Sequence, residues 1–316
     1  MTPHFRARRL VRRFGDLTAL DGIDLELAGD SVTGLIGRNG SGKTTLIRTI
    51  VGLLLPTAGE AKTFGTNVAD LGAAELGRVG AVFQENRMMG WSKVAGQLEF
   101  AKAYHRHWDD ARARTLLDAL ELDPGARVGT LSPGNAQKLS LLLAVCPRPD
   151  LLLLDEPVSA LDPIAREELL SFLLELVRED DTTILISSHV LVDIERVVDR
   201  VAVLDRGRVV RHGDLDDLLE DYQEWLVTAP PGPLPDCLTQ GFREDWILER
   251  RGTGRQAMLL VKTGGEAESR AAGFRERHGL EVEARPANLE RIFPSLVNGR
   301  PVSRASTGPT HQEARP

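Results

Sequence analysis

The fold is decided by the stretch Gly37-Arg38-Asn39-Gly40-Ser41-Gly42-Lys43-Thr44-Thr45, which fits the phosphate-binding loop pattern of glycine, four residues and then Gly-Lys-Thr. An apolar run at 32–36 predicts a strand before it, and the pattern of 44–54 predicts a helix after it. Glycines let successive backbone N–H groups turn toward phosphate oxygens, and the helix start adds the positive end of its dipole. A chance glycine-rich turn would lack this setting. We therefore expect Lys43 to reach a nucleotide's terminal phosphates and Thr44 to offer its hydroxyl to Mg²⁺.

A second motif supplies two adjacent carboxylates. The apolar run 151–154 predicts a strand buried on both faces, and it ends in Asp155 and Glu156. Such a strand places its last side chains at the carboxyl edge of the sheet, where ligands bind in open α/β folds. Asp155 is then a candidate Mg²⁺ ligand, and Glu156 a candidate to orient attacking water. Two solvated acids at a strand end are the alternative, which the phosphate loop weakens.

The rest of the chain up to about residue 220 has the pattern of an α/β protein, because short apolar runs alternate with helical segments. Asp162-Pro163 predicts a helix start, with a capping aspartate and a proline in the first turn. The arginines between Phe5 and Phe14 predict an edge strand with solvated charges. Further strands are expected at 79–83, 182–187 and 201–204, and a helix at 99–120.

The composition changes near the proline-rich stretch 228–235, which predicts a linker or loop. Beyond it, 246–250 and 256–261 predict a hairpin, and 266–277 predicts a helix. We therefore divide the chain into three parts. These are a main domain at 1–221, a small α+β domain at 222–298, and a tail at 299–316 whose low apolar content predicts disorder.

Composition restricts the class of protein. The 316 residues suffice for one large and one smaller domain, and the net charge of -7 argues against general nucleic-acid binding. Cys146 and Cys237 form no disulfide framework, as expected in a reducing compartment. No apolar run approaches the roughly 20 residues of a membrane span. The N-terminus also lacks the apolar core of a secretory signal.

Further short motifs surround the phosphate loop and the acidic strand in a fixed order. They are Gln84, Leu131-Ser132-Pro133-Gly134-Asn135, Ser159-Ala160-Leu161-Asp162 and His189. Each alone is weak, since a lone glutamine or histidine is more often an ordinary polar residue. The ordered set resembles the ATP-binding subunit of ABC transporters over about residues 5–219. The resemblance implies a P-loop NTPase of ABC type, with an antiparallel β subdomain and a helical subdomain, that hydrolyses ATP with Mg²⁺.

The resemblance also implies roles for single residues. Gln84 would lie near Mg²⁺ and the γ-phosphate, and His189 would hold that phosphate and the attacking water. Ser132 and the N–H of Gly134 would bind ATP held by a second subunit, whose phosphate loop Asp162 would touch. The implied catalytic residues are Lys43, Glu156 and His189, and the implied metal ligands are Thr44, Gln84 and Asp155. The implied nucleotide site consists of Phe14 stacking on adenine, the loop Gly37 to Thr45, Gln84, Ser132, Gly134 and Asp162.

The Leu-Ser-x-Gly motif departs from the family's commonest form. Pro133 stands in place of a glycine and Asn135 in place of a glutamine. Because proline has no backbone N–H, one donor is missing there. We expect hydrolysis to persist at a reduced rate, and in a heterodimer this would be the weaker composite site.

The resemblance implies two partners: a polytopic membrane permease, and a second ATPase subunit that is either identical or different. No nucleic acid is expected, and the chain would lie at the cytoplasmic face of the membrane through its permease. The segments His107-Trp108-Asp109 and 288–293 resemble ATPases that serve separate export permeases, so export is the favoured direction. A plain amphipathic helix is the alternative for Leu289 and Phe293. An import ATPase, or a soluble ABC-type ATPase that regulates or acts on ribosomes or DNA, stays open.

Overall fold

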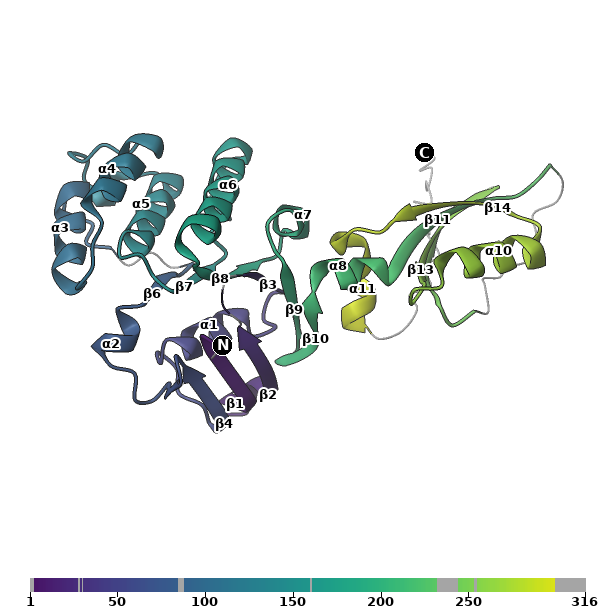
Figure 1. The fold of residues 1–316 in the computed structure, drawn as a ribbon, viewed down its shortest axis with the longest axis horizontal. Helices are drawn as coiled ribbons and strands as arrows, with labels where there is room; N and C mark the ends of the chain where they lie inside the picture. The colour runs from purple at the N-terminus through teal and green to yellow at the C-terminus, as the bar shows by residue number, and fades with distance from the viewer. Residues whose placement is uncertain are drawn as a thin grey trace, which may run out of the picture. The chain divides into compact units, whose positions relative to one another are not determined.

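The computed structural model (Figure 1) describes residues 3–27, 29, 31–84, 88–159, 161–231, 244–252 and 255–298. Its contacts divide the chain after Leu215 into two compact units, whereas the sequence placed the boundary after residue 221. The predicted tail at 299–316 lies outside the described residues, as do Ala160 and the second half of the proline-rich stretch, 232–235.

The first unit is built on a six-stranded sheet that carries the phosphate loop and the acidic pair. Its strand order is β10-β9-β3-β8-β7-β6, and all neighbours are parallel except β10, which is antiparallel to β9. Every residue of β3, β7 and β8 is buried, as expected of parallel strands covered on both faces. The bounds are β3 Val32–Gly37, β6 Val79–Val82, β7 Leu151–Asp155, β8 Thr183–Ser188, β9 Arg200–Asp205 and β10 Arg208–Asp214.

A second, antiparallel sheet has the order β2-β1-β4-β5. Its bounds are β1 Phe5–Phe14, β2 Leu17–Leu27, β4 Ala58–Thr63 and β5 Thr66–Asn67. The prediction of an edge strand was wrong, because β1 pairs with both β2 and β4. Phe5 and Leu10 are fully buried while Arg8 and Arg9 are exposed, so these arginines mark a solvated face of the sheet and not its edge.

Helices cover the six-stranded sheet on both sides (Figure 1). Helix α1 and the antiparallel sheet lie on one side, and α3, α4, α5 and α6 lie on the other. The predicted helix at 99–120 is two helices, because Asp109 begins α4 by accepting the Arg112 N–H at 2.8 Å. The bounds are α1 Lys43–Ile50, α2 Ala73–Leu76, α3 Val94–Tyr104, α4 Asp110–Ala119, α5 Pro133–Val145, α6 Pro163–Asp180 and α7 Leu191–Glu195. The predicted β and helical subdomains are thus confirmed.

The second unit is a four-stranded antiparallel sheet with the order β12-β13-β11-β14. Its core is aromatic: Trp225, Trp246 and Phe274 pack edge to face, with ring centroids 5.3–5.8 Å apart. The predicted small α+β appendage is therefore present. The bounds are α8 Leu215–Glu220, β11 Tyr222–Thr228, β12 Ile247–Arg251, β13 Gln256–Lys262, α10 Ala267–His278, β14 Glu281–Pro286 and α11 Leu289–Asn298.

The two segments that favoured export have local structural explanations. Leu289 and Ile292 are fully buried, so α11 packs as an amphipathic helix. Asp109 caps α4 and also accepts from Arg148, at 2.9 Å from its Nε. Both segments therefore carry less information about transport direction than their sequence suggested. Among the described residues, no helix combines the length and the apolar character needed to cross a bilayer.

Candidate active site

The phosphate loop leaves the end of β3 and is held by backbone contacts with two neighbouring segments. The N–H of Gly207, in the turn between β9 and β10, donates to Ser41 O at 2.9 Å. A Cβ on Gly37 would lie 2.3 Å from Leu204 O, and one on Gly42 would lie 2.7 Å from Ala19 O. Gly42 also has φ +112°, a conformation that side-chain-bearing residues rarely adopt. Close packing and backbone angle together require glycine at these positions.

Lys43 begins α1, and its ammonium group lies inside this loop. Nζ donates to Gly37 O at 2.8 Å and to Arg38 O at 3.4 Å, and it lies 3.7 Å from Glu156 Oε1. Only 7% of the Lys43 side chain is exposed. A buried ammonium is costly unless it is paired, and these carbonyl and carboxylate oxygens provide the pairing.

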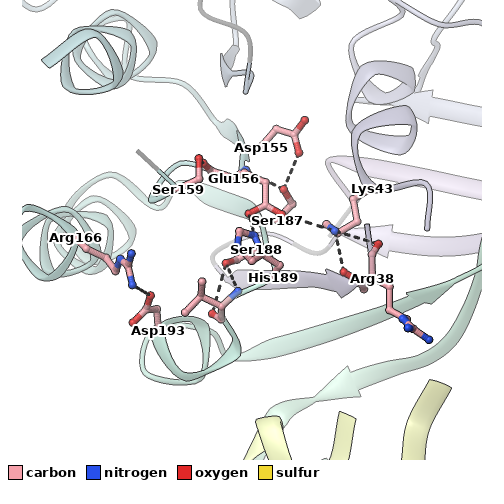
Figure 2. A network of polar contacts seen from close by, with 12 residues as sticks. Arg38, Lys43, Asp155, Glu156, Ser159, Arg166, Ser187, Ser188, His189 and Asp193 are labelled. Carbon is pink, nitrogen blue, oxygen red and sulfur yellow. Dashed lines mark hydrogen bonds and ion pairs between the residues drawn. The ribbon is translucent and has the colours of Figure 1, made fainter. Parts of the chain in front are cut away.

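The acidic pair at the end of β7 is joined to β8 through Ser187 (Figure 2). The Ser187 hydroxyl donates to Asp155 Oδ1 at 2.7 Å and accepts the Glu156 N–H at 2.9 Å. Asp155 is fully buried, and its other oxygen, Oδ2, has no hydrogen-bond partner among the described residues. Ser187 was missed at the sequence level. The signal available there was a serine at the end of a buried strand, two residues before His189.

Glu156 lies between two cationic or protonatable groups. Its Oε1 is on the Lys43 side, and its Oε2 is 2.7 Å from His189 Nδ1. Glu156 is 8% exposed, whereas His189 is 53% exposed, so the histidine lies toward solvent and the carboxylate behind it. Glu156 has φ +54°, which is uncommon for a residue with a side chain and marks a sharp turn directly after β7.

These residues line one cleft of about 690 Å³. The predicted residues in its lining are Phe14, Asn39, Gly40, Ser41, Gly42, Lys43, Thr44, Thr45, Gln84, Glu156 and His189. Gly37 and Arg38 contact Lys43, and Asp155 is linked to Glu156 through Ser187. Arg206 also lines the cleft. It was not predicted, because it belongs to the turn between β9 and β10, which is far from the phosphate loop along the chain.

Phe14, the last residue of β1, lines the cleft. Its side chain is 42% exposed, and the Arg12 guanidinium carbon lies 4.6 Å from the centre of its ring. That cation–π contact covers one side of the ring and holds its orientation. An exposed aromatic at the mouth of a phosphate-loop cleft suits stacking on a planar base.

Three predicted site residues, Ser132, Gly134 and Asp162, are not in the lining of the cleft; they lie at the starts of helices. Ser132 Oγ accepts the Asn135 N–H at 3.2 Å and begins α5. Asp162 Oδ1 accepts the N–H groups of Ile164 and Ala165, both at 3.0 Å, and begins α6. These hydrogen bonds, the one from Ala165 foremost, hold the pKa of Asp162 below its ordinary value.

Pro133 is the first residue of α5, with Ser132 as its cap. The first N–H of a helix has no partner inside the helix, and proline's fixed φ suits this position. The departure from the family's motif is therefore compatible with a well-formed helix start. The predicted loss of the backbone N–H at position 133 therefore affects only the first residue of α5.

The arrangement fits a magnesium ion held mainly by a nucleotide. No group of three histidine, cysteine or acidic side chains is placed to hold a metal within the described part of the chain. Asp155 Oδ2, which is buried and has no partner among the residues described, and the Thr44 hydroxyl in the cleft are hard oxygen ligands. Mg²⁺ is commonly bound by one or two such side chains together with phosphate oxygens and water.

Comparison with known proteins agrees with this geometry. A family model described as ABC transporter matches residues 20–159. A methionine import ATP-binding protein from Mesorhizobium japonicum is 34% identical over 82% of this chain and 73% of its own length. A Nod factor export ATP-binding protein I from Burkholderia lata is 32% identical over 92% of this chain and 95% of its own length. A solved dimeric bacterial ABC transporter cassette superposes with a TM-score of 0.60 at 25% identity, covering 67% of this chain and 98% of that one. Import ATP-binding proteins recur among relatives of comparable similarity.

The loop geometry predicts different costs for two glycine substitutions. Gly40→Ala introduces a side chain at φ +78° but meets no atom within 4 Å, so it should cost about 1–2 kcal/mol from backbone strain alone. Gly42→Ala adds a clash with Ala19 O and should cost roughly 1–3 kcal/mol more. Urea unfolding of the nucleotide-free protein measures both, and equal losses would show that the loop relaxes around the new methyl group.

Proposed function

Because the chain belongs to the ATP-binding subunits of ABC transporters, a family of ATPases, we propose that the cleft around Lys43 binds the phosphates of ATP and that Glu156 and His189 act in its hydrolysis. The observation that carries this assignment is the contact series Lys43–Glu156–His189 within one cleft. It supports a site in which a cation, a carboxylate and an imidazole surround the terminal phosphate.

Each group has a chemistry suited to its place. Lys43 supplies a positive charge, and the loop's N–H groups and the start of α1 add partial positive charge. Glu156 can accept a hydrogen bond from water and orient it toward phosphorus, because its carboxylate is fixed on both sides. His189 is more exposed, and its Nδ1–H donates to Glu156; in the imidazolium form, in which both ring nitrogens carry a proton, its Nε2 can also donate toward phosphate. Phe14 offers its ring to adenine.

Thr44, Asp155 and Gln84 would hold Mg²⁺, which neutralises developing charge on the phosphates when it is bound. Thr44 and Gln84 both line the cleft. Asp155 has the buried unpartnered oxygen described above.

A second ATPase subunit completes the proposed site. Ser132, Gly134 and Asp162 do not line the cleft of their own chain, which supports their acting on ATP held by a partner. The similar solved cassette is a dimer. ATP held between two such surfaces would stabilise the dimer through binding, and its hydrolysis would release the two subunits. A separate membrane permease would convert this closing and opening into transport.

For the direction of transport we propose import. Import ATP-binding proteins for methionine and for sulfate or thiosulfate recur among similar relatives, and the residues that favoured export have structural explanations. The earlier preference for export is therefore replaced. Export stays the second candidate for one reason: the Nod factor export relative matches along 95% of its own length, against 73% for the first methionine import relative.

Two substitutions test the hydrolytic site. Lys43→Ala should abolish ATPase activity and ATP binding, because the loop loses the buried ammonium group that would meet the terminal phosphates. Glu156→Gln keeps shape but loses the charge that orients water, so it should bind ATP, dimerise on it and hydrolyse it at least 100-fold more slowly. Steady-state phosphate release and gel filtration with ATP measure both effects. Normal turnover of Glu156→Gln would refute its role.

Transport direction is tested with the co-purified permease in proteoliposomes whose ATPase subunits face outward. An importer moves solute toward its ATPase side, so vesicles preloaded with radiolabelled methionine or sulfate should lose label when ATP is added. Glu156→Gln vesicles provide the matched control. ATP-driven accumulation in the lumen would instead establish export.

A further inference from the structure

We propose that Ser187 is a positioning residue for hydrolysis, which fixes the Asp155 carboxylate and the Glu156 backbone relative to one another. The inference rests on the proposed function, in which these two acids serve metal and water. Ser187 belongs to none of the motifs that identified the site. It acts through its neighbours, and we assign it no contact with the nucleotide.

The placement of Ser187 follows from strand register. Strands β7 and β8 are parallel, and Asp155 pairs directly with Ser187 across them. Both residues are fully buried, so their hydrogen bond is shielded from water in this structure. A buried hydroxyl paired with a buried carboxylate is expensive to break, because each group would then be left unsatisfied.

The hydrogen-bond capacity of the hydroxyl fixes its orientation. A serine has one proton to give and lone pairs to accept. At Ser187 the proton points to Asp155 Oδ1, 2.7 Å away, and an oxygen lone pair accepts the Glu156 N–H at 2.9 Å. One hydroxyl therefore binds the last residue of β7 and the residue that follows it (Figure 2).

Two consequences for the acids follow. With Oδ1 occupied by Ser187, Asp155 is left with Oδ2 for a cation. Glu156 turns sharply at φ +54°, and its N–H makes a second, longer contact of 3.2 Å with Ser187 O. Loss of the hydroxyl would free the carboxylate to rotate and loosen the turn that aims Glu156 between Lys43 and His189.

The same strand provides a matched control. Thr183 is fully buried at the start of β8, and its hydroxyl bonds His4 Nδ1 at 2.8 Å. Thr183→Val removes a buried hydroxyl of β8 at the end of the strand remote from the acids. Ser187→Ala removes one beside them. A merely structural role for Ser187 predicts equal behaviour of the two variants.

We expect Ser187→Ala to lower kcat about 10- to 100-fold, the range typical of groups that hydrogen-bond to a metal ligand without contacting the metal. Its affinity for ATP without metal should stay within about twofold of wild type, because the contacts of Lys43 are untouched. Mn²⁺ titrated with a non-hydrolysable ATP analogue and followed by electron paramagnetic resonance should bind at least 10-fold more weakly. Thr183→Val should leave all three quantities near wild type.

Stability gives a reading independent of activity. Ser187→Ala and Asp155→Ala should change the melting temperature non-additively, because each removes one partner of their shared hydrogen bond, whereas the effects of Thr183→Val and Asp155→Ala should add. The inference is overturned if Ser187→Ala matches Thr183→Val in kcat and Mn²⁺ binding, or if its effect on the melting temperature adds to that of Asp155→Ala. Wild-type hydrolysis by Asp155→Ala alone would count against the proposed site and not against the serine contact.

Discussion

The parallel register of β3, β8 and β7 is the constraint on which the active site depends. Ile36 pairs with Ser188 and Asp155 pairs with Ser187, so three chain segments leave the sheet at one edge. One becomes the phosphate loop, one the acidic pair and one the segment with His189. These strands are buried on both faces. A shift of their register by one residue would therefore separate paired polar groups and leave them buried without partners.

The charged side chains at that edge of the sheet are buried, where charge is energetically unfavourable. Lys43 and Glu156 are nearly buried and Asp155 is fully so. Their desolvation is offset by mutual attraction, by the carbonyls of Gly37 and Arg38 and by the Ser187 hydroxyl. Asp155 Oδ2 is the exception: within the described part of the chain it has no hydrogen-bond partner, which supports the proposed binding of a cation there.

The sequence predicted the parts of this site that belong to continuous motifs, because loop, acids and histidine each follow a strand that is visible as an apolar run. It could not predict Ser187 or Arg206, whose positions depend on pairing between segments distant in the chain. Two errors had similar causes. The arginines of β1 do not distinguish an interior strand from an edge strand, because they lie on the solvated face of the sheet. The helical pattern of 99–120 continues across the point where the Asp109 cap begins a new helix. Transport direction was inferred from residues that the fold uses for capping and packing.

Ser132 and Asp162 cap helices in this structure, and in the proposed dimer the same two side chains would also serve a partner subunit. In capping α5, Ser132 uses an acceptor lone pair, which leaves its hydroxyl proton for a phosphate oxygen. Asp162 receives both cap hydrogen bonds on Oδ1, which leaves Oδ2 for donors on another chain. The cap fixes each side chain at the positive end of a helix, so in the proposed dimer an approaching nucleotide would meet the oriented Ser132 hydroxyl and the aligned dipole of α5 without further ordering. Pro133 supports this, since it rigidifies the first turn at the position where its missing N–H would have had no helical partner.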